Sequence, residues 1–235
     1  MFRTVLVPLP SKDPTSDIEL EPVARGRAGA IVAWRDGDRV PLVRGTTRYT
    51  RATRMPPQAL CDLARAVETA ADVAIPFNNA LVERYTGEYR NMRAHSDQAQ
   101  DLQANSVIAV WSWYRNPHLP PSRAIRVRPK LTDQAETVVP LEHGHALIFD
   151  LAYNAAHLHR ITGDTGTDDN EWTGVTLRAS GTYLRNGMFS DGRALRLATA
   201  EEEAVFFACR KRENSRSDFE WPLFDFTVSP GDLIG

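Results

Sequence analysis

The sequence has 235 residues, of which 42% are hydrophobic and 25% are charged, and its formal net charge at pH 7 is −2. This length and composition fit one large globular domain, and the small net charge gives no overall attraction for a polyanion. Cys61 and Cys209 lie far apart and outside any C-x-x-C pattern, so neither a disulfide framework nor a thiolate zinc site is expected. The apolar stretch at the N-terminus is too short for a signal peptide, and no uncharged run reaches the ~20 residues that span a bilayer. We therefore expect a soluble cytoplasmic protein.

The first third of the chain predicts a loop, a hairpin and a helix. Residues 9–22 are rich in Pro, Ser, Asp and Glu, as expected of a loop. Residues 30–34 and 40–43 are β-prone and flank Asp36-Gly37, a pair suited to a tight hairpin turn. A pair of prolines then opens a segment that is predicted to be a core-facing helix. The apolar residues at helical spacing in this segment are Leu60, Leu63, Ala64 and Val67.

Short β-like runs separated by turn residues dominate the middle of the chain. They cover residues 80–85, 107–114, 124–129, 136–141, 145–151 and 172–178. Such a series predicts a barrel or a sandwich. Near the C-terminus, Thr199 and Glu202 form a capping box for a helix that we expect to pack outside the sheet. Because no internal repeat or long linker is visible, residues 1–235 are predicted to form a single domain.

The short motif with the clearest chemical meaning is His95-Ser96-Asp97. On an extended segment residues i and i+2 point the same way, so His95 and Asp97 can chelate one ion. Non-haem Fe(II) oxygenases hold their metal with two histidines and one carboxylate, which leaves positions open for co-substrate and O2. A third ligand must then come from a distant strand. The downstream candidates are two histidine pairs, His143 and His145, and His157 and His159.

Several motifs in the same order resemble the AlkB-like branch of the Fe(II)/2-oxoglutarate-dependent dioxygenases. "VPLVRGTTRY" is similar to the N-terminal region of that family, and "ALVERY" to its strand that ends in a tyrosine before the H-x-D pair. "LEHGHALIFDL" resembles an L-x-H-G turn into a hydrophobic strand, "HRI" the third ligand, and "RASGTYLR" the final strand. The resemblance spans about residues 40–185.

The resemblance implies an α+β, mainly β fold with a double-stranded β-helix core of the jelly-roll or cupin-like type and flanking helices. This catalytic core would cover about residues 76–186. An N-terminal extension or lid would cover about residues 1–55, and a C-terminal helical extension about residues 187–235.

The resemblance also implies that His95, Asp97 and His159 are the ligands of an Fe(II) ion. His157 would then lie beside the metal or orient one of its ligands. His143 is expected to be a turn residue, and His145 and the more distant His118 are weaker candidates for the metal.

The co-substrate 2-oxoglutarate needs a cationic anchor, since a guanidinium grips a carboxylate with two parallel donors. Arg178 fits this need, and Arg178, Ser180 and Thr182 alternate onto one face, as in a strand that presents an anchor and a hydroxyl to the same end of a ligand. Arg185 comes one position late for the second arginine of the family, and Tyr85 matches the tyrosine that hydrogen-bonds the co-substrate. A second register instead aligns "WTGVTLR" with the final strand and makes Arg178 the second arginine. In that register Trp172 stands where the first arginine should be, and Arg178 stays in the site either way. Independently of the register, Glu83 stands where relatives often have asparagine.

By this resemblance the protein would use Fe(II), 2-oxoglutarate and O2 to hydroxylate a substrate C–H bond, and an N-methyl product would lose formaldehyde. An alkylated nucleobase is one candidate substrate, since residues 25–54 hold eight arginines and two aspartates. The same patch is also explained as a solvated hairpin face, because arginine is abundant throughout the chain. Candidates for stacking on a base are Tyr49, Trp111, Trp113 and Tyr114.

Two other functions remain open at this point. The first is a hydroxylase of a small metabolite, amino acid or peptide, whose pocket the proline-rich residues 114–130 would border. The second is a non-catalytic binding protein on a degenerate oxygenase fold. No membrane partner is expected.

Overall fold

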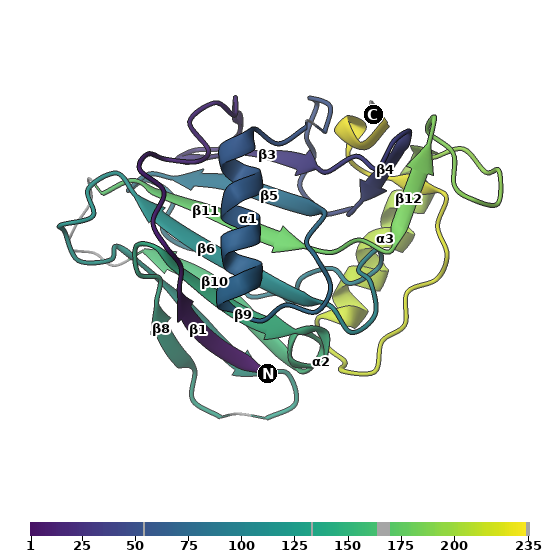
Figure 1. The fold of residues 1–235 in the computed structure, drawn as a ribbon. Coiled ribbons are helices and arrows are strands. Elements are labelled where there is room, and N and C mark those ends of the chain that lie inside the picture. Colours follow the sequence, from purple (N-terminus) through teal and green to yellow (C-terminus); the bar gives the residue numbers. More distant parts are fainter. Residues whose placement is uncertain (54, 133, 164–169, 234–235) are drawn as a thin grey trace.

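Two sheets that face each other form the body of the computed structural model, which describes residues 1–53, 55–132, 134–163 and 170–233 (Figure 1). The large sheet has the order β1-β9-β6-β11-β5-β3-β2, and the small sheet has the order β10-β7-β8. The strands of the large sheet are β1 (Phe2–Leu6), β2 (Glu21–Ala24), β3 (Arg27–Ala33), β5 (Asn79–Tyr85), β6 (Val107–Tyr114), β9 (His145–Asp150) and β11 (Trp172–Arg178). Those of the small sheet are β7 (Arg123–Pro129), β8 (Thr137–Pro140) and β10 (His157–Gly163).

The remaining elements are short strands and helices around these sheets. Two further pairs of strands are β4 (Arg39–Leu42) with β12 (Thr182–Arg185), and β13 (Arg196–Leu197) with β14 (Phe226–Thr227). The helical elements are α1 (Gln58–Ala70), α2 (Leu151–Ala156), α3 (Ala200–Glu213) and a final 3-10 turn (Pro230–Leu233). None of the helices within the described ranges has both the length and the apolar character needed to cross a bilayer.

The arrangement of the strands is that of a double-stranded β-helix. Strands β5, β11, β6 and β9 are neighbours in the large sheet and pair antiparallel. In the small sheet β10 pairs with β7, and the extended segment around His95 joins its other edge through bridges from Asn91 to Thr162 and from His95 to His159. Four extended segments therefore face four others, and the predicted jelly-roll core is confirmed.

Two apolar cores hold these layers together. Helix α1 crosses the outer face of the large sheet (Figure 1), and its predicted stripe of Leu60, Leu63, Ala64 and Val67 is buried there. A second core fills the space between the two sheets. Its largest fully buried side chains include Tyr85, Tyr114, Ile125 and Trp172. The outer core fixes the large sheet, and the inner core leaves one end of the jelly roll open for a cavity.

The predicted hairpin around Asp36-Gly37 is wrong. The turn forms, with Gly37 at a φ of 62° and backbone hydrogen bonds of 3.0 Å between Asp36 and Arg39 in both directions. The two arms then part, because β3 is already flanked by β2 and β5, which leaves it no free edge. Strand β4 pairs with β12 instead.

Three features of the helices and termini differ from the expectations or extend them. Strand β1 adds an edge to the large sheet, and Asp150 caps the six-residue helix α2 by accepting a hydrogen bond from the Tyr153 amide; neither element was predicted. Helix α3 begins with the predicted capping box of Thr199 and Glu202. It lies beside the open end of the jelly roll, where Asn214 and other residues line the cavity, and not on the outside of the sheet.

The C-terminal segment is tied to the core by a buried ion pair. Arg44 contacts Asp101 at 2.8 Å and donates to the carbonyl oxygens of Phe224 and Phe226. Nearby, Asp232 accepts a hydrogen bond from the Thr227 hydroxyl. Burial raises the pKa of Asp232 to about 7, with a further contribution from the charge of Asp101. The folded protein therefore prefers the neutral form of this carboxyl group.

The raised pKa predicts a pH-dependent stability difference for Asp232→Asn. Between the unfolded pKa of 3.8 and the folded value of about 7, the native state holds a proton that the unfolded state has lost, so wild-type stability falls as pH rises through this window. The variant lacks this titration. We expect its stability relative to wild type to increase by about 2–3 kcal/mol from pH 5 to pH 8, measured by urea unfolding. Parallel pH profiles for the two proteins would contradict this assignment.

Candidate metal centre

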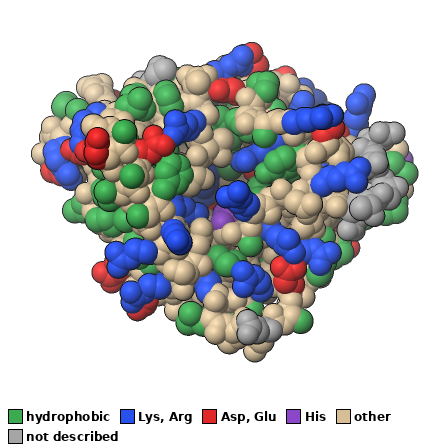
Figure 2. Space-filling view, turned by 180° about the vertical axis from the view of Figure 1, so that it is seen from behind, with side chains coloured by type: hydrophobic (Ala, Val, Ile, Leu, Met, Phe, Trp, Pro, Cys, Tyr) green, Lys and Arg blue, Asp and Glu red, His purple; other side chains and the backbone are tan. Residues whose placement is uncertain are grey.

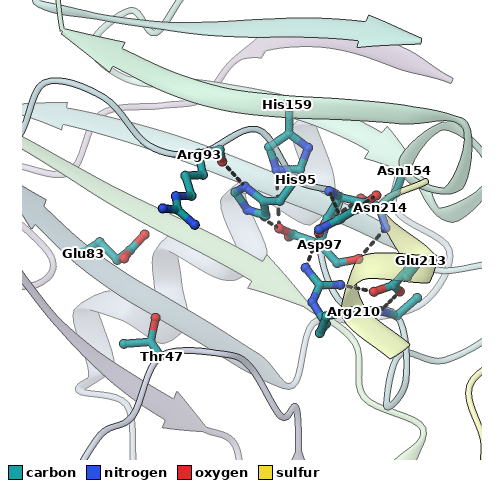
Figure 3. A network of polar contacts seen from close by, with 12 residues as sticks. Thr47, Glu83, Arg93, His95, Asp97, Asn154, His159, Arg210, Glu213 and Asn214 are labelled. Carbon is teal, nitrogen blue, oxygen red and sulfur yellow. Dashed lines mark hydrogen bonds and ion pairs between the residues drawn. The ribbon is translucent and has the colours of Figure 1, made fainter. Parts of the chain in front are cut away.

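Three side chains from two neighbouring extended segments converge at the open end of the jelly roll (Figure 3). The Asp97 Oδ1 atom lies 3.6 Å from His95 Nε2 and 3.4 Å from His159 Nε2. One candidate ligand atom of each residue lies within 4.8 Å of the other two, and no other such group occurs in the described part of the chain. The backbones of His95 and His159 pair directly, which sets the two imidazoles side by side with ring centroids 4.7 Å apart.

Hydrogen bonding and charge prepare these groups for a cation. The Nδ1 atom of His95 lies 2.9 Å from the Arg93 carbonyl oxygen; a carbonyl accepts, so Nδ1 carries the proton and Nε2 keeps its lone pair. Burial lowers the pKa of His159, which favours the neutral imidazole that binds metals. Burial opposes ionisation of Asp97, but its contacts with the imidazoles of His159 and His95 and the charge of Arg178 hold its pKa well below the usual range. Two imidazoles and one carboxylate are the donor set of the Fe(II) facial triad.

A cavity of about 600 Å³ opens next to the three side chains. Its walls come from the inner faces of both sheets, from residues 43–47 and 91–94, and from the last turns of α3. In the space-filling view from behind, a histidine is visible in the central hollow, with several Lys or Arg side chains around it (Figure 2). Five arginines line the cavity, against two carboxylates. The arginines are Arg27, Arg44, Arg93, Arg178 and Arg210, and the carboxylates are Glu83 and Asp97.

Two polar side chains on the cavity wall have unused hydrogen-bonding groups. Arg178, at the end of β11, is 7% exposed, and no hydrogen bond or ion pair joins its guanidinium to the described residues. The hydroxyl of Tyr49 is buried and also has no partner there. A buried guanidinium without a partner is costly, so its position on the wall indicates a site for an anionic group.

The structure places the other predicted co-substrate residues outside this wall. The buried Ser180 hydroxyl donates to the carbonyl oxygens of Leu42 and Thr182, because the chain leaves the strand after Arg178 and does not continue the alternation. Arg185 is largely exposed and contacts Asp38 at 2.9 Å. Neither of these two residues lines the cavity. Their expected roles are therefore not supported by the geometry.

The second register of the final strand agrees better with the structure. Trp172 is buried between the sheets, with its ring centroid 5.0 Å from that of Tyr85, so an aromatic contact occupies this position. The Tyr85 hydroxyl donates to Glu83 at 2.8 Å. The other Glu83 oxygen accepts from Arg27 Nε at 2.7 Å, and this ion pair lines the cavity. Glu83 and Arg27 therefore line the cavity, whereas Tyr85 and Trp172 do not.

The remaining histidines are not members of this three-residue group. His157 stacks on Tyr153 with ring centroids 3.8 Å apart, and its Nδ1 lies 2.9 Å from the Tyr153 carbonyl oxygen. His143 occupies the predicted turn and accepts a hydrogen bond from the Tyr114 amide. His145 contacts Glu142 at 3.5 Å, and His118 lies in a turn.

Comparison with known families decides the class of the protein. The family model described as "2OG-Fe(II) oxygenase superfamily" matches residues 35–187, which include the three converging side chains and Arg178. The chain belongs to the 2OG-Fe(II) oxygenase superfamily. A search of curated proteins gave no match. A solved structure described as "The structure of OsALKBH1" is similar at 12% identity and a TM-score of 0.46, covering 66% of this chain and 78% of that chain.

Members of the 2OG-Fe(II) oxygenase superfamily are dioxygenases that use Fe(II), 2-oxoglutarate and O2, and the donor set of this oxygenase fits such an ion. Three polar residues that surround Asp97 were not indicated by any sequence motif, namely Asn154 of α2, Arg210 of α3 and Asn214 at the end of α3 (Figure 3). Asp150 followed by "LAYNAA" was a usable signal for the short helix that carries Asn154.

Proposed function

We propose that His95, Asp97 and His159 bind Fe(II), and that Arg178 anchors the distal carboxylate of 2-oxoglutarate. The observation that carries this proposal is the convergence of the three ligand atoms on one cavity whose wall also holds an unpaired, buried guanidinium. When bound, the iron, 2-oxoglutarate and O2 would supply an oxidant that converts a substrate C–H bond into C–OH, with one oxygen atom of O2 entering this hydroxyl group, the other entering succinate, and CO2 released. The chain supplies binding, orientation and exclusion of water.

Each side chain has a separate task in this proposal. The Arg93 carbonyl oxygen holds His95 in the tautomer that presents Nε2 to the metal. Arg178 orients the co-substrate by a charge-assisted contact. The Arg27–Glu83 pair and Tyr49 line the part of the cavity wall that would face the substrate. Because Glu83 already accepts from Arg27 and Tyr85, its charge is balanced without a ligand.

We further propose an alkylated nucleobase as the substrate, in keeping with the sequence resemblance to AlkB-like proteins. Of the five arginines of the cavity, Arg27, Arg44 and Arg210 form ion pairs with carboxylates. Arg93, Arg178 and the cationic side chains around the hollow favour a substrate that carries phosphates (Figure 2). Tyr49 lines the cavity and therefore remains a candidate for stacking on a base. Trp111 and Trp113 pack in the core under α1, and Tyr114 packs between the sheets, so none of these three can stack on a ligand in the cavity.

A second candidate substrate class, a small metabolite, amino acid or peptide, is favoured by one specific observation. Six of the seven described arginines in residues 25–54 already pair with carboxylates. These six are Arg25, Arg27, Arg39, Arg44, Arg48 and Arg51, and Arg54 lies outside the described residues. The positive charge of residues 25–54 is therefore mostly neutralised.

A cytoplasmic location also stays a prediction from the sequence.

The experiment that tests the proposal is a measurement of succinate formation in the presence of Fe(II). Methylated DNA, methylated RNA and a metabolite pool would be screened as stimulants, with formaldehyde release as a second readout. Formaldehyde from a methylated oligonucleotide supports the nucleobase substrate. Stimulation by a metabolite alone replaces it with the second class, and no Fe(II)-dependent succinate under any condition contradicts the proposed reaction.

Charge reversal at the cavity mouth separates the two substrate classes. Arg93 is exposed and lines the cavity, so Arg93→Glu should weaken binding of an oligonucleotide by about 10-fold at low salt. Arg65→Glu is a matched control, because Arg65 is an exposed residue of α1 on the outer face of the large sheet. Equal affinities for both variants, measured by fluorescence anisotropy, would argue against a phosphate contact at the mouth.

A further inference from the structure

The position of Asp97 depends on side chains from outside the β-ladder. The backbone of His95 is held by its strand partner, with hydrogen bonds of 2.9 Å and 2.7 Å to and from His159. This ladder stops one residue before Ser96, since no backbone partner holds Ser96 or Asp97 among the described residues. The two imidazoles are therefore placed by the sheet, whereas the carboxylate between them is not.

Beyond the end of the ladder, side chains at the end of helix α3 bind the backbone next to Asp97 (Figure 3). The carboxamide oxygen of Asn214 accepts from the Ser96 amide at 2.9 Å, and Arg210 Nη2 donates to the Ser96 carbonyl oxygen at 2.9 Å. The Ala99 amide donates to Glu213 Oε1 at 3.0 Å. Three side chains from one helical turn thus bind the backbone on both sides of Asp97.

Asn154 of helix α2 binds the remaining backbone groups of Asp97. The carboxamide oxygen of Asn154 accepts from the Asp97 amide at 2.8 Å, and its nitrogen donates to the Asp97 carbonyl oxygen at 2.8 Å. Asn154 is 2% exposed, so both contacts form away from bulk water. Every backbone polar group of Ser96 and Asp97 is then bonded to a side chain of α2 or α3.

The contacts from α3 are themselves held firmly. Arg210 and Glu213 are 7% and 6% exposed and form an ion pair, and Glu213 Oε1 also accepts from Trp221 Nε1 at 2.8 Å. These residues lie beyond residue 187, where the match to the family model ends. The last turn of α3 therefore lies outside the segment that the family model matches.

We propose that Arg210, Glu213 and Asn214 form a clamp that positions the Asp97 carboxylate for metal binding. These are positioning residues that act through the backbone of residues 96–99. The proposal rests on the proposed role of Asp97 as an iron ligand. It assigns to the C-terminal extension a task in forming the metal site itself.

Asn214 allows the sharpest test, because it caps α3 in a helical conformation that alanine also adopts. Asn214→Ala removes the acceptor for the Ser96 amide, and Asn214→Asp keeps it. We expect Asn214→Ala to weaken Co(II) affinity about 10-fold and to change the visible Co(II) spectrum, while Asn214→Asp stays close to wild type. Ser215→Ala is the matched control, since within the described part of the chain the Ser215 hydroxyl bonds only to the Arg212 carbonyl oxygen of α3.

Wild-type affinity and spectrum in Asn214→Ala would overturn the clamp. Failure of the proposed metal site gives a different result: wild type and Asp97→Ala would then bind Co(II) equally. Hydrogen exchange on wild type provides a test that needs no folded variant. Adding Co(II) should slow exchange in residues 96–99 and in the last turn of α3 together, and protection at the histidines alone would also overturn the clamp.

Discussion

Asp97→Ala should abolish Fe(II)-dependent turnover of 2-oxoglutarate and weaken metal affinity by more than about 100-fold. Removal of residues that only support metal ligands costs about 10–100-fold, and loss of a ligand exceeds this range. Asp97 is also the only carboxylate near the two imidazoles among the described residues, so no neighbour replaces it. Metal binding is measured by titration of the apoprotein with Co(II), and turnover by succinate formation.

Asp218→Ala is a suitable control for this variant. Asp218 is an exposed residue that pairs with Arg216, and it does not line the central cavity. The control should keep wild-type metal affinity. Normal turnover in Asp97→Ala would remove Asp97 from the site and leave the two histidines without the carboxylate of the facial triad.

Arg178→Met should weaken co-substrate binding and at the same time stabilise the protein without ligands. The KM for 2-oxoglutarate should rise on the order of 100-fold, because a buried charge-assisted contact to the co-substrate is lost. The protein without ligands should become more stable by about 1–3 kcal/mol, because a buried guanidinium without a partner is replaced by an apolar side chain. Kinetics at saturating Fe(II) and urea unfolding of the apoprotein measure the two effects.

Arg123→Met gives the contrasting control. Arg123 is also buried, but its guanidinium donates to the carbonyl oxygens of Tyr89 and Thr86, so its loss should destabilise the protein. A structural role for Arg178 would likewise lower stability and leave the KM unchanged. That pair of results would contradict the assignment of Arg178 as the co-substrate anchor.

The metal ligands were predictable because their geometry is local. Residues two apart on an extended segment share a face, which brings His95 and Asp97 together whatever the rest of the fold does. The strand pattern and the motif order then pointed to His159, and the structure brings these three side chains to one point. The stripe of α1 and the capping box of α3 were predictable for the same reason, since each depends on residues within a few positions of each other.

The expectations that differed from the structure depend on contacts between distant segments. The arms around Asp36-Gly37 have hairpin character, but the first arm pairs with β5 and the second pairs with β12. Ser180 has the spacing of a ligand residue, yet its hydroxyl is used by the carbonyl oxygen of Leu42. Asn154 and Asn214 carry no local signal for their roles, since each becomes meaningful only when its helix meets the Ser96-Asp97 backbone.

The most direct test of the central claim is anomalous diffraction from crystals of the protein grown with Mn(II) in place of Fe(II). We predict one strong peak in contact with Nε2 of His95, Nε2 of His159 and a carboxylate oxygen of Asp97. A peak that His157 or another residue ligates in place of any of these three, or no peak in this cavity at saturating metal, would contradict the account.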